Sequence, residues 1–257
     1  MEELNYNLPA CYRPNNFDEL LGNEGVKRVL KAYQKNPNRP KSIMLSGPTG
    51  GGKTTTGRIY ARTLNCSQLT EGFNPCGQCP SCQMPLQGCG SIIEVNCTMR
   101  RGLDDMRQLI RVSNLTPRQN FRILILDEIQ GATSEAHNAL LKPLEEPPAL
   151  TYWILCTSEP NKVPKAIAGR CVQLALTYPP PAALQNRLRE IARKDFGRDI
   201  ARLLRPYLLD IIDQCDGQPR ASIELMGVLG TALSVDKKAL SNQLLAKQIV
   251  ESFLDDL

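Results

Sequence analysis

The stretch SIMLSGPTGGGKTTTGRIYARTLN, residues 42–65, decides the fold, because it joins a strand pattern, a glycine-rich loop and a helix pattern. Its first five residues read as a buried strand, and the residues from Lys53 onward read as a helix. Between them GPTGGGKT, residues 47–54, fits GxxxxGK[ST], a loop whose backbone N–H groups hold phosphates at a helix N-terminus. A strand before this pattern and a helix after it predict a phosphate-binding loop.

The residue types of this loop suit a nucleoside triphosphate with magnesium. Glycines let backbone N–H groups approach the phosphates, Lys53 can reach the β- and γ-phosphates, and the Thr54 hydroxyl can hold Mg²⁺. A glycine-rich turn without a ligand is the structural alternative. The residues expected to contact ATP in this stretch are Gly47, Pro48, Thr49, Gly50, Gly51, Gly52, Lys53, Thr54 and Thr55.

An acidic pair follows a second buried strand pattern, RILILDEIQ at residues 122–130. Asp127 stands where a magnesium-coordinating carboxylate is needed, and Glu128 stands where a base can orient an attacking water. Two acids at the end of a strand can also cap a helix, but Lys53 upstream favours the catalytic interpretation. The sequence therefore predicts ATP hydrolysis.

The rest of the chain predicts an α/β domain followed by a helical one. Apolar runs that alternate with helix patterns indicate a parallel sheet covered on both faces. YPPPAA at residues 178–183 ends this alternation, and the patterns after it are those of amphipathic helices. We expect an ATPase domain over residues 1–178 and an all-helical domain over residues 179–257. The five strand patterns begin at residues 42, 92, 122, 152 and 172.

The length and composition of the chain are sufficient for these two domains. The absence of a leader pattern and of a spanning stretch leads us to expect a cytoplasmic protein. The 257 residues, 42% of them hydrophobic, suffice for one good core and a smaller second one. The net charge of +5 is mildly basic and decides nothing alone. No basic region followed by an apolar run opens the chain, and no stretch approaches the roughly 18 apolar residues of a spanning helix. No membrane partner is expected.

Four of the ten cysteines are clustered: Cys66, Cys76, Cys79 and Cys82. In a reducing compartment clustered cysteines are better interpreted as metal ligands than as disulfides. Four thiolates and no open position predict a closed, structural Zn²⁺ site. Unligated thiols are one alternative and an iron–sulfur cluster is another, although nothing else in the chain indicates redox chemistry.

With these motifs in place, the chain resembles the ATPase subunit of the bacterial DNA polymerase III clamp loader, the gamma/tau type of AAA+ ATPase. The resemblance spans nearly the whole chain, and its most specific parts are the cysteine insertion at 66–82 and NALLKPLEEPP at 138–148. It implies an AAA+ five-stranded parallel sheet with a zinc-knuckle insertion, followed by a small helical lid. In that family the knuckle is structural and takes no direct part in the chemistry.

Further site residues follow from the resemblance alone. It places the sensor-1 hydroxyl at Ser158, beside Thr157, and an arginine finger for a neighbouring subunit's ATP at Arg170. Gly169 stands where the family usually has serine, and a surface arginine is the plain alternative for Arg170. The resemblance also makes Arg220 the sensor-2 arginine. The segment expected to fold around the adenine contributes Tyr12, Arg13 and Pro14.

The resemblance also implies partners. These are other clamp-loader subunits or copies of this chain in a ring, a sliding clamp, and primer–template DNA bound without sequence preference. The DNA-contacting helix of the family corresponds to residues 98–114, although a solvated helix face explains the same residues equally well. Its arginines are Arg100, Arg101, Arg107 and Arg111.

The function implied is that of an ATP-hydrolysing clamp-loader subunit of DNA replication, with ATP, Mg²⁺ and Zn²⁺ as cofactors. A non-hydrolysing ring subunit of the delta-prime type is the first alternative, and another AAA+ ATPase that remodels DNA is the second. The family's third domain, a helical collar, would follow the lid. We expect either a piece of a longer protein or a naturally short form, and the sequence leaves both open.

Overall fold

A computed structural model of the 257-residue chain describes residues 7–83, 90–235 and 252, so the end of the lid expected at 179–257 lies largely outside the described residues. The chain divides into two compact units. We call Pro14–Thr177 the sheet unit, and we call the residues up to Arg13 together with those from Tyr178 the helical unit. Residues 7–13 thus belong with the helices, whereas the sequence had placed them in the ATPase domain.

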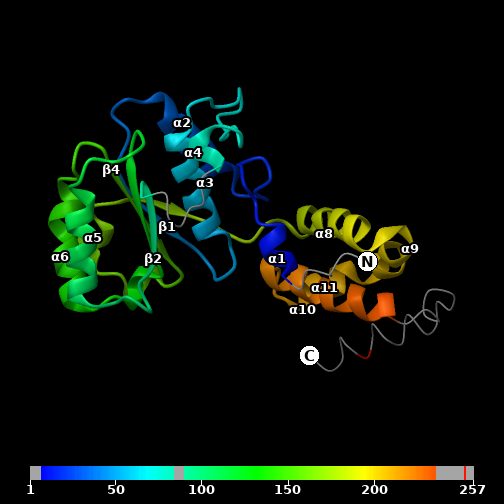
Figure 1. Cartoon of the computed structure of the whole chain (residues 1–257). Coiled ribbons are helices and arrows are strands. Elements are labelled where there is room, and N and C mark those ends of the chain that lie inside the picture. The colour runs from blue at the N-terminus through cyan, green and yellow to red at the C-terminus, as the bar shows by residue number, and fades with distance from the viewer. Residues whose placement is uncertain (1–6, 84–89, 236–251, 253–257) are drawn as a thin grey trace. The chain divides into compact units, whose positions relative to one another are not determined.

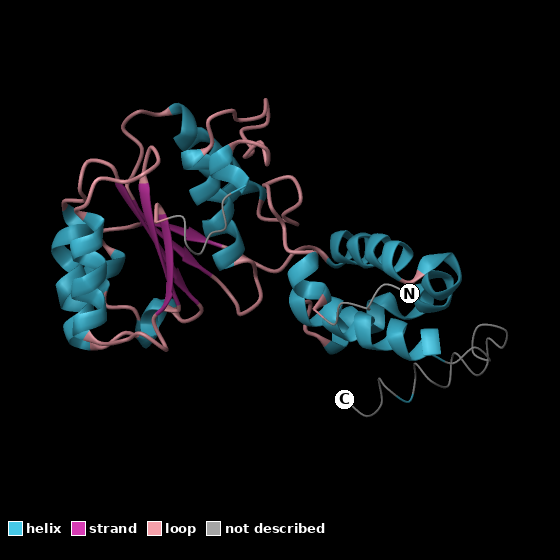
Figure 2. Cartoon of the chain, viewed as in Figure 1, coloured by secondary structure: helices cyan, strands magenta, loops and turns pink. Residues whose placement is uncertain are grey.

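The sheet unit contains the expected five-stranded parallel sheet, in the order β2-β3-β4-β1-β5 (Figures 1 and 2). Strand β4 therefore lies between β1 and β3 and pairs with both. Because all strands run parallel, their carboxyl ends meet at one edge of the sheet, where loops build ligand sites. The strands are β1 (Ser42–Ser46), β2 (Ile92–Asn96), β3 (Arg122–Asp127), β4 (Thr151–Thr157) and β5 (Val172–Ala175).

Two apolar cores cover the two faces of this sheet, because alternate residues of each strand point to opposite sides. Ile43 and Leu45 belong to the core beneath α2 and α3, whereas Met44 belongs to the core beneath α5 and α6 (Figure 1). This arrangement confirms the α/β fold predicted from apolar strand patterns. The helices of the unit are α2 (Glu24–Lys35), α3 (Lys53–Asn65), α4 (Pro80–Gln83), α5 (Leu103–Ser113), η1 (Ile129–Gly131), α6 (Ser134–Glu145), η2 (Pro160–Lys162) and α7 (Lys165–Ala168).

The helical unit packs α1 against the helices after Tyr178, whose buried residues form a core separate from the two of the sheet unit. Leu8 of α1 lies so close to α11 that a Cβ added at Gly227 would come within 2.6 Å of its Cδ1 atom. This contact explains why α1 belongs to the helical unit. Among the described residues no helix is both long and apolar enough to cross a bilayer. The elements are α1 (Leu8–Cys11), α8 (Pro181–Asp195), α9 (Gly197–Leu204), η3 (Arg205–Tyr207), α10 (Leu208–Gln214) and α11 (Pro219–Val235).

Candidate nucleotide site and cysteine cluster

The phosphate loop joins the end of β1 to the start of α3 in a conformation that needs its glycines. Gly50 and Gly52 have φ angles of 73° and 88°, which residues with a side chain rarely adopt. A Cβ at Gly47 would lie 2.4 Å from the backbone oxygen of Leu176. The Lys53 side chain turns back into the loop, 5% exposed, and donates to the carbonyl oxygens of Gly47 and Pro48 at 3.0 Å. Its charge is therefore held inside the loop.

Thr54 and Asp127, which are 73 residues apart, meet at the carboxyl edge of the sheet. The Thr54 hydroxyl donates to both oxygens of the Asp127 carboxylate, each at 2.9 Å. Asp127 ends β3 and Thr54 is the second residue of α3. A hydroxyl and a carboxylate are oxygen ligands of the kind that Mg²⁺ prefers. The pair would therefore hold the metal of a Mg²⁺–nucleotide complex.

Glu128 belongs to a hydrogen-bonded group at the same edge, and one of its partners, Ser158, directly follows β4. Ser158 donates to the Glu128 Oε2 atom from its hydroxyl at 2.7 Å and from its backbone N–H at 3.3 Å. Gln130 Nε2 donates to the same oxygen at 2.5 Å and to the Ser158 hydroxyl at 2.9 Å. Thr157 donates to Gln130 Oε1 at 2.7 Å. Gln130, to which no sequence motif assigns a role, joins Glu128 to Thr157 and Ser158 at the end of β4.

The two adjacent acids have opposite electrostatic environments. Burial raises the pKa of Asp127, and the hydrogen bond from Thr54 offsets only part of that effect. Burial also disfavours the charged form of Glu128, but hydrogen bonds from Gln130 and Ser158 and the charge of Lys53 outweigh it, so its pKa lies below the usual value. Glu128 is therefore held as a carboxylate near the phosphate loop.

Arg170 lies just after α7 and is engaged within its own chain. Its guanidinium donates to Glu145 Oε2 from Nε at 2.9 Å, with Nη2 2.8 Å from the same oxygen, and to the carbonyl oxygen of Ala166 at 2.8 Å. Glu145 is the last residue of α6. Both side chains keep solvent exposure, 31% for Arg170 and 61% for Glu145. Such a pair is weak enough to open if a stronger anion approaches.

Four other predicted residues belong to the helical unit or to its boundary with the sheet unit. Tyr12 packs against α8, with Arg187 and Lys194 at 5.6 and 5.3 Å from its ring centre. Burial and a hydrogen bond with Asp195 raise the pKa of its hydroxyl. Arg220 is exposed in the first turn of α11. Arg13 ends the helical unit's first segment, and Pro14 begins the sheet unit, which also contains the phosphate loop.

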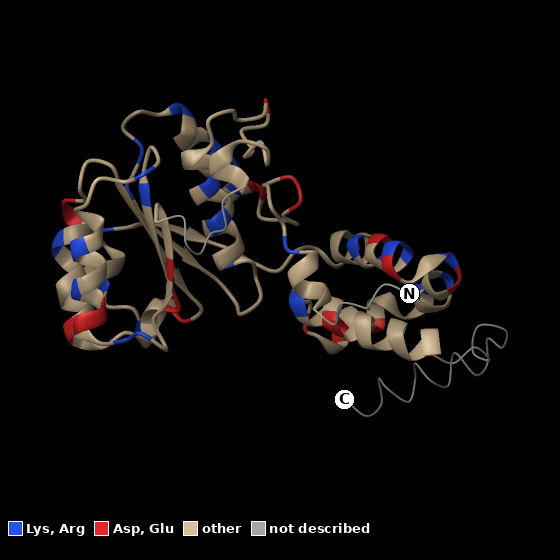
Figure 3. Cartoon of the chain, in the orientation of Figure 1, with Lys and Arg blue, Asp and Glu red and all other residues tan. Residues whose placement is uncertain are grey.

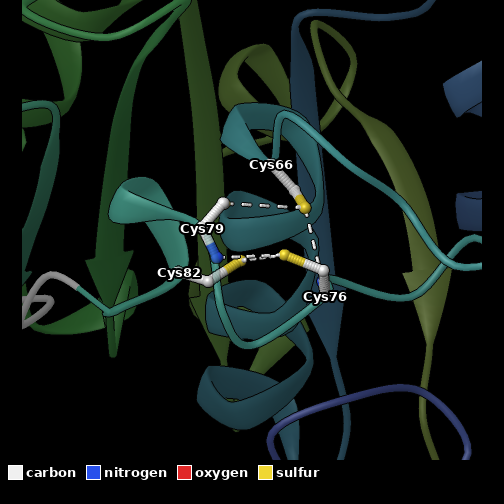
Figure 4. Close-up of side chains that lie close together, drawn as sticks. All are labelled: Cys66, Cys76, Cys79 and Cys82. Carbon is white, nitrogen blue, oxygen red and sulfur yellow. Dashed lines mark hydrogen bonds between the residues drawn. The ribbon is translucent and has the colours of Figure 1, made fainter.

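The four clustered cysteines come together as predicted, around the turn that leads into α4 (Figure 4). Their sulfur atoms all lie within 4.8 Å of one another, and two pairs, Cys76 with Cys82 and Cys66 with Cys79, are 4.0 Å apart. Four sulfurs at about 2.3 Å from a tetrahedral Zn²⁺ would be separated by about 3.8 Å. The cluster therefore fits a closed tetrahedral zinc site.

Hydrogen bonds favour the thiolate form of two of the four cysteines, Cys76 and Cys79, whereas burial raises the pKa of Cys66 and Cys82. The amide of Cys76 donates to Cys66 Sγ at 3.3 Å, and the amides of Gln78 and Cys79 donate to Cys76 Sγ at 3.4 and 3.2 Å. Burial disfavours the Cys79 thiolate, but hydrogen bonds from Ser67 outweigh it and lower the pKa of that thiol to about 6. Thiolate is the form that binds metal, so these contacts favour metal binding by Cys76 and Cys79.

The arginines predicted to contact DNA are exposed on the sheet unit, on α5 and in the turn before it (Figure 3). Arg107 lies 3.6 Å from Asp104 in the first turn of α5. Met99, beside Arg100, is 84% exposed, the largest value among the exposed large hydrophobic residues of the described chain. These residues are accessible to a polyanion. The four are Arg100, Arg101, Arg107 and Arg111.

Sequence comparisons connect the chain with bacterial replication proteins. A profile of the family described as DNA polymerase III, delta subunit, matches residues 22–180. The DNA polymerase III subunit tau of Bacillus subtilis is 31% identical over 186 residues, which is 72% of this chain and 33% of the relative. The subunit gamma/tau of Mycobacterium tuberculosis strain H37Rv is 36% identical over 188 residues, or 72% and 32% of the two chains. The chain thus spans about a third of the length of these curated relatives.

Solved structures show the same fold at lower sequence identity. The RuvB Holliday junction branch migration motor of Thermotoga maritima superposes with a TM-score of 0.64 and 20% identity, over 94% of this chain and 72% of that chain. At this identity the likeness concerns the fold alone. It confirms the predicted fold, a parallel sheet with helices followed by a helical region.

Proposed function

The chain belongs to the DNA polymerase III clamp-loader ATPase family of the gamma/tau type, and we propose that it hydrolyses ATP to help open a sliding clamp and load it onto primer–template DNA. The observation that carries this proposal is the meeting of Thr54, Asp127 and Glu128 beside Lys53. A glycine-rich turn that binds no ligand would not need Thr54 and Asp127 as a pair of possible Mg²⁺ ligands. Nor would it need the charged Glu128 carboxylate beside them. The cytoplasm is the proposed compartment, on the basis of the replication relatives.

The phosphate loop would bind the triphosphate through its backbone N–H groups and the N-terminus of α3. Lys53 would exchange its loop carbonyl partners for the β- and γ-phosphate oxygens. Thr54 and Asp127 would hold Mg²⁺, which supplies charge neutralisation for the phosphates. These contacts fix the γ-phosphate at the carboxyl edge of the sheet, within reach of Glu128.

Glu128 would orient the attacking water. The oxygen of that water forms a bond to the γ-phosphorus, the bond from this phosphorus to the β–γ bridging oxygen breaks, and ADP leaves with the bonding electrons. Glu128 accepts the proton of the water, since its carboxylate is kept charged by Gln130 and Ser158. Ser158 would fix the position of this carboxylate directly, and Thr157 would do so through Gln130.

Arg170 would act on the ATP of a neighbouring subunit, and Arg220 would act on its own. A planar guanidinium stays charged and binds phosphate oxygens with two N–H groups, which suits both roles. To reach the ATP of a neighbouring subunit, Arg170 would have to leave Glu145. Because this ion pair is partly exposed to solvent, breaking it would cost little free energy. Tyr12, Arg13 and Pro14 would line the adenine, and Arg100 and Arg101 would bind the DNA backbone.

Calorimetry of ATP binding, followed by ATPase assays with and without primer–template DNA and a bacterial sliding clamp, tests the proposal. Lys53→Ala should abolish ATP binding, whereas Lys142→Ala, an exposed lysine of α6, should bind normally. Glu128→Gln should bind ATP without turnover. A wild-type chain that binds no ATP would instead favour a structural ring subunit, and DNA unwinding without any response to the clamp would favour another DNA-remodelling ATPase.

Mixing two inactive variants tests the role of Arg170 in a neighbour's site. Arg170→Ala keeps its own phosphate loop and Glu128, whereas Glu128→Gln keeps its arginine. In a mixed ring, a site formed by the first variant's loop and the second variant's arginine is complete, so part of the ATPase rate should return. Rates that merely average the two inactive proteins would contradict an arginine that acts between subunits.

A further inference from the structure

One buried side chain, Asn74, ties the cysteine insertion to the N-terminal segment of the sheet unit. Asn74 is 6% exposed and lies between Cys66 and Cys76 in the sequence. Its Oδ1 atom accepts from the backbone N–H of Phe17 at 2.9 Å, and its Nδ2 atom donates to Asp18 Oδ2 at 2.6 Å. The side-chain amide thus binds two consecutive residues that lie more than 50 positions away in the chain.

The loop that carries Asn74 is closed by its own hydrogen bonds and by the cluster. The backbone N–H and C=O of Asn74 pair with Thr70, through its hydroxyl at 3.2 Å and its N–H at 3.0 Å. Two residues later the amide of Cys76 donates to Cys66 Sγ. Both ends of the loop are therefore cluster ligands, and a metal bound by the four sulfurs would fix the loop that presents Asn74.

The segment that Asn74 holds lies against the phosphate loop and α3. Phe17 is fully buried in the same core as Ile59 of α3, the helix that begins at Lys53. A Cβ added at Gly52 would lie 3.5 Å from Leu20 Cδ1, so the Leu20 side chain lies beside the loop. Lys27 Nζ donates to the backbone oxygen of Leu20 at 2.8 Å and fixes the end of the segment.

We propose that Asn74 is a positioning residue that couples metal occupancy of the cysteine cluster to nucleotide affinity. The metal-bound cluster holds the loop, Asn74 holds Phe17–Leu20, and this segment supports the phosphate loop from the side of Gly52. The inference rests on the proposed function, since the ligand of the loop is taken to be ATP. Loss of any link lowers the fraction of molecules with a formed loop, and the apparent affinity falls by that fraction.

The first test is Asn74→Leu, which removes both hydrogen bonds and keeps a side chain of similar size. Fluorescently labelled ATP should bind about tenfold more weakly, because two buried hydrogen bonds no longer hold the segment. Metal analysis should still find zinc, since all four thiolates remain. Asn38→Ala, an exposed asparagine of the same unit, is the matched control and should bind labelled ATP like the wild type.

The second test removes zinc with a chelator that spares magnesium. In the wild type the affinity for labelled ATP should fall by a similar factor, whereas in Asn74→Leu the further loss should be small, because both changes break the same link. Hydrogen exchange of the backbone of residues 14–22 should also become faster on zinc removal, in protein without nucleotide. The hydrogen-exchange measurement is made on the wild-type protein without nucleotide, so it does not depend on whether the Asn74→Leu variant folds.

The outcomes separate this inference from the proposed function. If the wild type binds no ATP, the proposed function fails, and the exchange of residues 14–22 still reports whether zinc fixes the segment. If the wild type binds ATP but zinc removal changes neither the affinity nor the exchange, the coupling is wrong. Normal affinity in a zinc-loaded Asn74→Leu protein would likewise exclude Asn74 as the link.

Discussion

Ser158 holds the Glu128 carboxylate by a single oxygen, since its hydroxyl and its backbone N–H both donate to Oε2, at 2.7 and 3.3 Å. Gln130 donates to that same oxygen. Within the described part of the chain, the Oε1 atom of Glu128 has no hydrogen-bond partner. One oxygen of the carboxylate is thus fixed by the protein, and the other remains available to a water.

Replacing Ser158 with alanine should lower kcat for ATP hydrolysis about tenfold or more and leave the affinity for ATP within a factor of about two. The reason is that the lost hydroxyl contacts Glu128 and Gln130 in the structure. Steady-state rates and binding titrations measure the two quantities. Ser234→Ala, in the helical unit, serves as the control, and an unchanged kcat in Ser158→Ala would contradict this role.

Gln130→Glu should destabilise the sheet unit at neutral pH. It places a second carboxylate at the position where Gln130 Nε2 now lies 2.5 Å from Glu128 Oε2. Two carboxylates so close cannot both ionise without cost, and about 1–2 kcal/mol of unfolding free energy should be lost. Near pH 4 one of the pair is protonated and the loss should shrink. Urea unfolding at both pH values checks this against Gln108→Glu, an exposed position on α5.

Asp127→Asn should raise the melting temperature of the nucleotide-free protein at pH 7. Burial raises the pKa of Asp127, so the folded state holds a proton more tightly than the unfolded state does. Above the unfolded pKa the carboxylate therefore disfavours folding, and this penalty grows until the pH passes the folded pKa. At pH 3 both states are protonated and the gain should vanish. Asp213→Asn, at an exposed aspartate, should show no such gain, and a lower melting temperature for Asp127→Asn at pH 7 would refute the argument.

Cys79→Ser should eliminate bound zinc and expose the insertion to proteases. A hydroxyl is a poor replacement for a thiolate, and three remaining ligands leave the tetrahedral site open. Zinc analysis and limited proteolysis measure the two effects, with cleavage expected within residues 67–83. Cys215→Ser changes a cysteine outside the cluster and should retain zinc. Full zinc retention in Cys79→Ser would mean that this cysteine is not a ligand.

Two glycines should respond to alanine in opposite directions. A Cβ at Gly230 of α11 would lie 2.6 Å from the ring of Phe196, so Gly230→Ala should cost about 1–3 kcal/mol of stability. A Cβ at Gly25 of α2 meets no atom within 4 Å, and Gly25→Ala should stabilise by up to about 1 kcal/mol, because alanine favours the helix. Thermal unfolding of both variants measures these shifts. A stabilised Gly230→Ala would show that α11 and Phe196 can separate freely.

The strands were predictable because each is a local pattern. All seven residues of β4 are buried, and a run of that kind is typical of a central parallel strand. In β5 the exposed Gln173 alternates with half-buried neighbours, in keeping with its place at the edge of the sheet. The order of the strands is not contained in such patterns, since it depends on which apolar faces pack together after the chain has collapsed.

The candidate site was predictable to the same extent. Lys53, Thr54 and Asp127 stand in motifs whose spacing fixes their chemistry, and the structure brings them together. Gln130 and Asn74 were not assigned roles, because a glutamine or an asparagine acquires one only through residues distant in the sequence. The placement of Leu8 against Gly227 was missed for the same reason. Local sequence patterns do not show which polar and small side chains pair with residues far away in the chain.

The position of β4 between β1 and β3 sets the width of the site. Neighbouring strands are about 4.8 Å apart, so the strand that leads into the phosphate loop and the strand that ends in Asp127 are separated by about 10 Å. The side chains of Thr54 and Asp127 bridge this spacing, with their oxygen atoms 2.9 Å apart. Strand β4 thus acts as a spacer, so a substitution that displaces this fully buried strand should disturb the phosphate loop and Asp127 together.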